Sequence, residues 1–400
     1  MGVTGRLALR SPRFVVLALS LACLLGLAVY MIEYDSAEES AKSPLEAAAR
    51  EEKKSHHADH NAIKHANVFT KPNAKIDDMK EKYDRGDGGN DDVKIKKDIQ
   101  KTEIEKAKQT TPDRIDVYFA LTNVHKDRRE QFDRFAKSLL KHTRSRLRFH
   151  ALVDSTGRDA VTGSVPEGPS IKILFYDIND VAKRAEPFVK PLKDHFVGSQ
   201  RSYYSNPIFF VPVVLHRLLG DDVHRLVVLD TDMEFRSDIQ ILANLFDSFS
   251  PNHLMGLAHE QQPVYRHVFH MYRNSHKGTL VGDPPPNGLT GFNSGVVLMH
   301  LERMRSSKFY NQAVQGQIVK EMAERYLFQG HLGDQDFYTL LSLERADLFF
   351  VLPCTWNRQL CTWWGDHGYK GVMDEYHTCE GNVNLYHGNC NTPIPIDNNA

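Results

Sequence analysis

Apolar runs of strand length alternate with helical patterns from about residue 113 onward. Strands are predicted at 115–121, 147–153, 171–176 and 225–230, and helices at 131–141 and, beyond Pro212, within 207–219. Strands that alternate with helices predict an α/β fold with a parallel or mostly parallel central sheet flanked by helices. Ligands of such sheets bind beyond the carboxyl ends of the strands, so the residues that follow each strand are the first candidates for function.

A long apolar segment lies near the N-terminus. Residues 14–32 contain no charged side chain, and at about 1.5 Å per helical residue they span roughly 28 Å, close to the thickness of a bilayer core. Basic residues precede this segment and acidic residues follow it, which places residues 1–13 in the cytosol and the remaining chain in the lumen. We expect a transmembrane signal-anchor at 14–32. A cleaved signal peptide is the alternative, but the apolar region is long and no clear small-x-small cleavage site follows it.

The next stretch, 33–112, is polar, highly charged and almost free of large apolar clusters. Such a composition cannot bury enough apolar surface to offset the entropy lost on ordering. We therefore expect a flexible lumenal stem at 33–112 and a folded domain at 113–400.

Charge and cysteine content indicate which partners and which cellular compartment to expect. The formal net charge is −1 with no basic stripe, so there is no electrostatic reason to expect nucleic-acid binding. Cys354, Cys361, Cys379 and Cys390 cluster near the C-terminus without the paired C-x2-C spacing of zinc ribbons. In an oxidising compartment they predict two disulfides with three possible connectivities, of which Cys354–Cys379 with Cys361–Cys390 is our preferred pairing.

A pair of carboxylates follows the strand predicted at 225–230. Asp230 and Asp232 are separated by one residue, so both can converge on one hard cation such as Mg²⁺ or Mn²⁺, which can also bind a diphosphate. An acidic pair alone is a weak signal, because such pairs are common in solvated loops. The apolar strand directly before it favours the metal site.

Three further motifs combine small or polar residues with strands or helices, and each has a structural alternative. Gly291–Met299 leads from glycine and Asn293-Ser294 into an apolar strand, where a tight turn explains the glycines equally well. Gly333–Asp336 opens a predicted helix, for which Asp334 could simply be the N-cap. His387-Gly388 follows a partly apolar stretch near the C-terminus, and a structural or exposed histidine is the alternative there.

Taken together, these motifs resemble the glycosyltransferase family 8 group, which includes glycogenin and bacterial galactosyltransferases. The resemblance covers about residues 113–395 and implies a GT-A nucleotide-sugar transferase fold behind the N-terminal anchor and stem, with 113–400 as the catalytic domain. It implies that the loop with Thr122 and Asn123 holds uridine, that Asp230, Asn293, Ser294 and Gly388 bind the donor, and that Asp230, Asp232 and His387 bind Mn²⁺, with Mg²⁺ as the alternative. A lysine that often follows the histidine-glycine motif is absent, so we expect another group to contact the diphosphate.

The C-terminal part is similar to a narrower enzyme family. The segments 352–364 and 386–393, rich in cysteine and tryptophan, resemble animal xyloside α-1,3-xylosyltransferases, which extend xylose-glucose O-glycans on EGF repeats such as those of Notch. This resemblance implies UDP-xylose as donor and an O-glycosylated EGF-repeat protein as partner. It also favours a single-pass type II protein of the endoplasmic reticulum membrane, with the Golgi as the alternative.

Family resemblance further implies that the anomeric configuration is retained. Gln335 occupies the position of a possible nucleophile, but an amide is a poor one, so we expect front-face substitution in which the departing phosphate accepts the acceptor's proton. Gln335 would orient the sugar and Asp334 would bind its hydroxyls. Helix capping remains the structural alternative for both.

The acceptor side of the site is less defined by the sequence. All three tryptophans, Trp356, Trp363 and Trp364, fall within nine positions. They form either a disulfide-pinned core cluster or an aromatic platform for the acceptor, with Asn357 and Arg358 as polar companions.

Three other functions stay open. A related transferase could use another UDP-sugar or acceptor, and a metal-dependent hydrolase could use Asp230, Asp232 and His387, although no further ligand cluster such as H-x-x-E-H occurs. A noncatalytic glycan-binding protein is the third. The presence of Asp230, Asp232 and His387 together with Gln335 argues against it.

Overall fold

The computed structural model describes residues 114–196 and 206–395. The tail, anchor and stem predicted at 1–13, 14–32 and 33–112 lie outside the described residues. Among the described helices, none has the length and apolar character needed to cross a bilayer.

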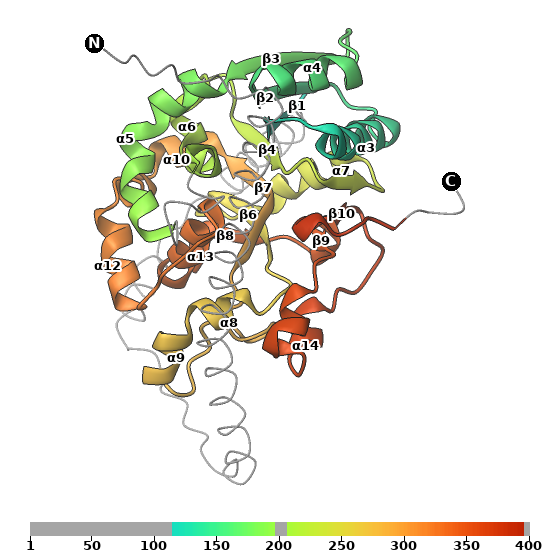
Figure 1. Cartoon of the computed structure of the whole chain (residues 1–400). Coiled ribbons are helices and arrows are strands. Elements are labelled where there is room, and N and C mark those ends of the chain that lie inside the picture. The colour runs from blue at the N-terminus through green and yellow to red at the C-terminus, as the bar shows by residue number, and fades with distance from the viewer. Residues whose placement is uncertain (1–113, 197–205, 396–400) are drawn as a thin grey trace, which may run out of the picture. The chain divides into compact units, whose positions relative to one another are not determined.

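A seven-stranded sheet forms the centre of the domain, in the order β3-β2-β1-β4-β7-β6-β8 (Figure 1). All neighbouring strands are parallel except that β7 runs antiparallel to both β4 and β6. The predicted mostly parallel sheet is therefore confirmed, and the four predicted strands agree with the observed bounds to within one residue. These bounds are β1 Ile115–Leu121, β2 Leu147–Val153, β3 Ile171–Asp177, β4 Arg225–Leu229, β6 Met255–His259, β7 Phe292–His300 and β8 Phe349–Val351.

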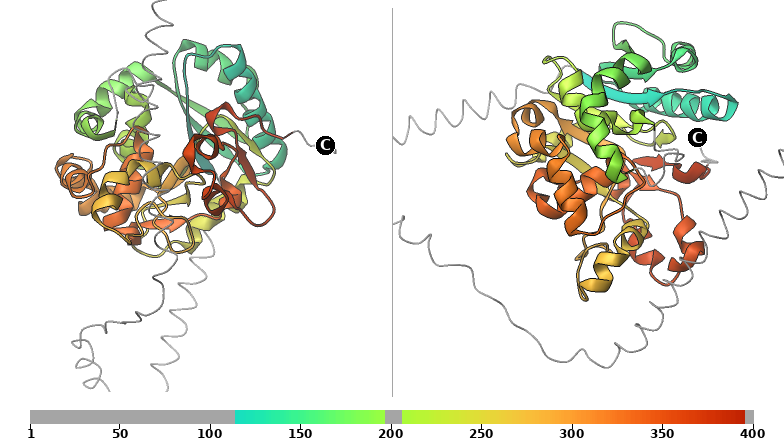
Figure 2. Two further views of the ribbon diagram at one scale, coloured as in Figure 1. Left: turned by 60° about the horizontal axis from the view of Figure 1, so that its bottom comes forward. Right: turned by 60° about the vertical axis from the view of Figure 1, so that its left-hand side comes forward.

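Both faces of the sheet are buried, which explains why its strands read as continuous apolar runs. Along β1, Val117 and Phe119 enter one core while Tyr118 enters the other. Helix α3 (Lys126–His142) covers the first core with Phe132, Phe135 and their neighbours, and α5 (Ile178–Phe196) covers the second. Figures 1 and 2 show these helices on different faces.

Helices of very different length connect the strands. The helix predicted at 131–141 lies within α3, whereas the segment 207–219 is mainly a 3₁₀ helix followed by one short α-helical turn. The α-helices are α3 Lys126–His142, α4 Ser155–Ser164, α5 Ile178–Phe196, α6 Leu215–Leu218, α7 Ile239–Asn244, α8 Val264–Val268, α9 His270–Ser275, α10 Leu301–Ser306, α11 Lys308–Ala313, α12 Gln317–Arg325, α13 Asp334–Glu344 and α14 Met373–His377. The 3₁₀ and π segments are η4 Pro207–Val214, η5 Leu245–Ser248, η6 Ala346–Leu348, η7 Cys354–Trp356, η8 Gly365–Tyr369 and η9 Asn389–Asn391.

A second, three-stranded sheet joins the C-terminal part to the turn after β4. It has the order β5-β10-β9, with β5 Met233–Phe235, β9 Arg358–Gln359 and β10 Leu385–His387. Two disulfides, Cys354–Cys379 and Cys361–Cys390, join the segments that flank β9 and β10, with Cα–Cα distances of 5.8 and 5.7 Å. The preferred pairing is confirmed.

Candidate active site

The two aspartates and the histidine meet where the two sheets join. Asp230 and Asp232 lie between β4 and β5, and the antiparallel pairing of β5 with β10 places His387 opposite Met233. Nε2 of His387 lies 3.5 Å from Oδ2 of Asp230 and 3.4 Å from Oδ1 of Asp232. One possible ligand atom from each residue lies within 4.8 Å of the other two. This mixed set of carboxylates and imidazole fits a divalent cation.

Backbone hydrogen bonds hold this group in place. The N–H of Asp230 donates to the carbonyl oxygen of Gly295 (2.9 Å), and the N–H of Gly388 donates to that of Asp232 (2.8 Å). A Cβ on Gly388 would lie 2.8 Å from the carbonyl oxygen of Thr392. Glycine after His387 is therefore required for space, which gives the histidine-glycine motif a physical reason.

The charges of the group favour a cation. Burial and the neighbouring charge of Asp232 raise the pKa of Asp230 to about 6. Because 58% of the Asp230 side chain is exposed, solvent weakens the effect of burial, and repulsion between the two carboxylates is the firmer cause. Burial disfavours the charged form of His387, but the Asp232 carboxylate raises its pKa overall. A divalent cation would relieve the concentrated negative charge.

Helix α13 begins beside this group and brings two more predicted residues to it. Oδ1 of Asp334 accepts a hydrogen bond from Oγ of Ser294 (3.0 Å), and Oε1 of Gln335 accepts one from the Ser294 N–H (3.2 Å). Burial and the charge of Asp230 raise the pKa of Asp334 well above its ordinary value. The side chain of Asp334 thus contacts strand β7. The N-cap of α13 is Gly333, so Asp334 is the first residue of the helix and not its N-cap.

Glu260 is a member of the site that the sequence interpretation missed. It follows β6 directly, is 3% exposed, and accepts hydrogen bonds on Oε2 from Nε2 of Gln335 and Nδ2 of Asn293, both at 3.1 Å. Burial raises its pKa to about 7, against the effect of these two donors. The signal that could have found it is the one that found Asp230, an acidic residue directly after an apolar strand.

The residues predicted to hold uridine lie at the carboxyl end of β1. Arg128 donates a hydrogen bond to the carbonyl oxygen of Thr122 (2.8 Å), and the N–H of Asn123 donates to Asp154 (2.8 Å). Asn123 has a φ of 51°, a conformation that asparagine tolerates better than most residues. The loop is thus ordered by its own hydrogen bonds, and binding of uridine there stays a prediction.

The predicted acceptor residues have different environments. Trp356 is buried in the core, Asn357 is fully buried, and NH1 of Arg358 donates to the carbonyl oxygen of His377 (2.6 Å). Trp363 is 46% exposed and stacks on His367, with 3.5 Å between ring centroids. Trp356 therefore fits the interpretation as part of a core cluster, and Trp363 is exposed enough to fit the interpretation as an aromatic platform. The acceptor role of all four residues stays a prediction.

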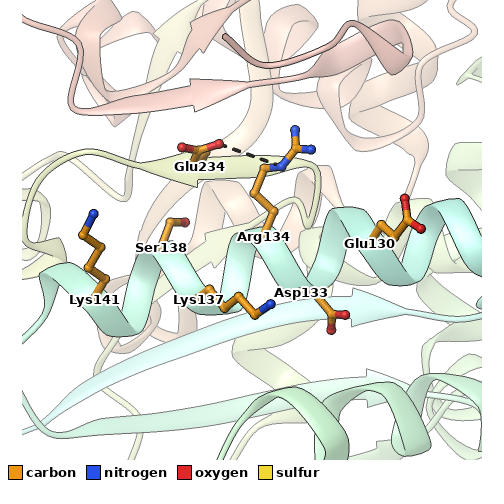
Figure 3. Close-up of a pocket in the computed structure, with 7 residues that line it drawn as sticks. All are labelled: Glu130, Asp133, Arg134, Lys137, Ser138, Lys141 and Glu234. Atoms are coloured by element: carbon orange, nitrogen blue, oxygen red, sulfur yellow. Dashed lines mark ion pairs between the residues drawn. The ribbon is translucent and has the colours of Figure 1, made fainter. Parts of the chain in front are cut away.

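A recess lies between helix α3 and strand β5 (Figure 3). Charged side chains line it, and the one ion pair between them joins Nε of Arg134 to Oε2 of Glu234 at 3.9 Å. None of the predicted site residues contributes to this recess, whose lining residues are Glu130, Asp133, Arg134, Lys137, Ser138, Lys141 and Glu234.

The mostly parallel sheet places Asp230 and Asp232 beyond β4, and the small sheet brings His387 to them, which together define a GT-A-like protein with a candidate metal site. The family model "Glycosyl transferase family 8" matches residues 104–370, and the chain belongs to this family.

Two similar proteins have names that mention xylose transfer. Human "Xyloside xylosyltransferase 1" is 44% identical over 257 residues, which are 63% of this chain and 65% of the relative. The match thus spans less than two thirds of that relative's length. "Xylosyl- and glucuronyltransferase LARGE1" of Danio rerio is 29% identical over 248 residues, 60% of this chain and 29% of the relative.

A solved structure is also similar. The apo crystal structure of mouse xyloside xylosyltransferase 1 has 39% sequence identity and a TM-score of 0.68, and the match covers 70% of this chain and all of that one. This likeness supports the fold described above through most of the described residues.

Proposed function

We propose that the chain is a metal-dependent retaining glycosyltransferase that moves xylose from UDP-xylose, in α-1,3 linkage, onto the xylose of xylose-glucose O-glycans on EGF repeats such as those of Notch. The family match supports glycosyl transfer. The 44% identity to a protein named xyloside xylosyltransferase supports the xyloside acceptor and the transferred sugar. The observation that carries the chemistry is the convergence of Asp230, Asp232 and His387.

Asp230, Asp232 and His387 would hold Mn²⁺, with Mg²⁺ as the alternative. When bound, the cation would neutralise the charge that develops on the departing diphosphate. His387 can serve as a neutral ligand through Nε2, because its Nδ1 is 2.9 Å from Oδ1 of Asn357 and can donate its hydrogen there.

Asp334 and Gln335 would act on the sugar from the start of α13. Asp334 would bind hydroxyl groups of xylose, and Gln335 would orient the sugar without forming a bond to it, since an amide is a poor nucleophile. Substitution would then occur on the front face, with retention, and the leaving phosphate would take the acceptor's proton. Thr122 and Asn123 would hold uridine, and Asn293, Ser294 and Gly388 would complete the donor site.

The cellular setting belongs to the same proposal. The two disulfides are typical of the oxidising secretory pathway. We place the catalytic domain in the lumen of the endoplasmic reticulum, behind an anchor at 14–32 and a stem at 33–112, with the Golgi as the alternative. Trp363 and Arg358 would contact the EGF-repeat acceptor, and the buried Trp356 and Asn357 would contribute to its recognition only by supporting them from beneath.

The test is a transfer assay with the full-length chain, a panel of UDP-sugars, Mn²⁺ and an EGF repeat that carries xylose-glucose. We expect one added pentose by mass spectrometry with UDP-xylose alone, and loss of this product on chelation. Asp232→Asn removes one carboxylate ligand and should lower the rate by at least about 100-fold. Asp159→Asn, at an exposed carboxylate on α4, is the matched control and should keep the wild-type rate.

The outcomes separate the competing functions. Transfer of a different sugar would retain the glycosyltransferase and refute UDP-xylose. Release of free xylose at the same rate with and without acceptor would indicate a hydrolase. Folded protein that turns over no donor would refute catalysis and favour a glycan-binding protein.

A further inference from the structure

A buried chain of amide side chains connects the metal-binding histidine to the sugar-binding helix. Two neighbouring backbone N–H groups of strand β7 fix its direction. The N–H of Ser294 donates to Oε1 of Gln335 (3.2 Å), and the N–H of Gly295 donates to Oδ1 of Asn293 (3.0 Å). A backbone N–H can only donate, so the facing atom of each amide must be its oxygen.

The direction of these two amides determines their other ends. Once the oxygens of Gln335 and Asn293 accept from β7, their NH₂ groups point the opposite way, and both reach Oε2 of Glu260 at 3.1 Å. Two donors that converge on one atom require an acceptor there. The carboxylate of Glu260 supplies it, and an apolar side chain would leave two buried amides without a partner.

The same logic extends from Asn293 to the histidine. Oδ1 of Asn293 also accepts a hydrogen bond from Nδ2 of Asn357 (2.9 Å), so Oδ1 of Asn357 faces Nδ1 of His387. That oxygen can only accept, which puts the hydrogen of the neutral imidazole on Nδ1. Nε2 is then left with a lone pair directed toward Asp230 and Asp232.

Burial holds this row of hydrogen-bonded side chains in a single orientation. Asn357 is fully buried, and its own carbonyl oxygen accepts a hydrogen bond from Nε2 of Gln261 (2.9 Å). Asn293 and Glu260 are each less than 10% exposed. Water therefore competes little for these hydrogen bonds, and an amide that flips would lose a partner at both ends.

We propose that Glu260 is a positioning residue whose carboxylate ends this buried chain, fixing Gln335 on one side and, through Asn293 and Asn357, presenting Nε2 of His387 to the divalent cation on the other. The inference rests on the metal site of the proposed function, and it gives Glu260 no contact with the cation. Its effect on the metal passes through two asparagines.

The test measures Mn²⁺ affinity by isothermal titration calorimetry on the full-length chain, so its readout is independent of activity. Glu260→Met keeps the volume and removes the acceptor, whereas Glu260→Gln retains an oxygen that can accept from both amides. We expect Glu260→Met to weaken Mn²⁺ binding by about 10-fold or more, as for other residues that orient a metal ligand. Glu260→Gln should stay within about 3-fold of wild type, on the same scale.

A second variant tests whether the effect of Glu260 on Mn²⁺ affinity passes through the buried asparagines. Asn357→Ala breaks the direct bond to His387 and should weaken binding about as much as Glu260→Met. The double variant should lose little more than either single one, because both interrupt one path. Asp116→Asn is the matched control, since Asp116 is a buried carboxylate at the other end of β1 that accepts from His150 (2.9 Å) and Arg148, and an amide oxygen can still accept there. It should leave Mn²⁺ affinity within about 3-fold of wild type.

Each result decides between the two proposals. Wild-type chain that binds no Mn²⁺ refutes the metal site and this inference with it. Wild-type chain that binds Mn²⁺, with Glu260→Met equal to it, refutes this inference alone. Glu260→Gln as weak as Glu260→Met would also overturn it, because charge and not hydrogen-bond direction would then be what matters.

Discussion

At the scale of single residues, the site depends on positions where no side chain fits. A Cβ on Gly295 would lie 2.3 Å from Cε1 and 2.7 Å from Nδ1 of His387, and 3.0 Å from Cε of Met233. Gly295 has no positive φ that would demand glycine for backbone reasons. The glycine is therefore needed because the imidazole packs directly on strand β7.

Gly295→Ala should consequently displace His387 from the two aspartates. We expect Mn²⁺ affinity to fall by about 10-fold or more, because the ring cannot move without losing its bond to Asn357. Gly371→Ala is the matched control, since a Cβ there meets nothing within 4 Å. Calorimetric titration with Mn²⁺ checks both, and an unchanged affinity in Gly295→Ala would show that the ring accommodates a methyl group.

At the scale of elements, the small sheet that carries His387 is short and depends on covalent support. Strand β9 has two residues and β10 has three. Cys361 and Cys390 lie just beyond their ends, and Oδ1 of Asn389 accepts hydrogen bonds from the N–H groups of both Leu360 and Cys361. The disulfide therefore closes the end of the sheet next to the metal group.

Replacing each cysteine pair by serines should separate stability from site geometry. The two disulfides close loops of similar length, with separations of 25 and 29 residues, so each double variant should lose about 3–4 kcal/mol of unfolding free energy. Cys361→Ser with Cys390→Ser should also weaken Mn²⁺ binding more than Cys354→Ser with Cys379→Ser, because Cys390 lies three residues after His387. Urea unfolding and calorimetry measure the two effects, and equal Mn²⁺ affinities would contradict the second.

At the scale of the whole domain, buried histidines make stability depend on pH. Burial lowers the pKa of His216 to about 4, and it lowers that of His300 to a similar value. In the unfolded chain the ordinary value is near 6.5. Between these values the unfolded state binds more protons, so this contribution is fully present above pH 6.5 and is lost as pH falls toward 4. Glu260 acts in the opposite sense, because its pKa is raised to about 7 and stability is lost as pH rises from its unfolded value toward 7.

His216→Gln tests the first effect. The glutamine can still bond to Asn311, the partner of Nε2, but it does not titrate. We expect the loss of unfolding free energy between pH 7.5 and 4.5 to be smaller in the variant by roughly 2–3 kcal/mol. Urea unfolding at the two pH values measures it, and an unchanged difference would mean that His216 titrates alike in both states.

Much of the fold could be predicted because it depends on local patterns. Apolar runs long enough for strands, each followed by a helical pattern, predicted the mostly parallel sheet and the bounds of β1 and β2. The order of the strands and the antiparallel direction of β7 could not be read in this way, because they depend on pairing between segments far apart in the sequence. The segment 207–219 was predicted to be helical beyond Pro212, and α6 lies there, but the 3₁₀ form of 207–214 was not predicted, because an all-apolar run shows no helical period.

For the site, the sequence pattern by itself determined Asp230 and Asp232 as candidates after a strand, and the family resemblance of the sequence added His387, Asp334 and Gln335. Only the tertiary structure decided that β5 and β10 pair so that His387 reaches the aspartates. It alone revealed Glu260 and the interior place of Asn357, because hydrogen bonds between residues 30 to 96 positions apart leave no periodic trace in the sequence. A sequence records what each residue can donate or accept, whereas partners are chosen only when folding removes water and brings the groups together.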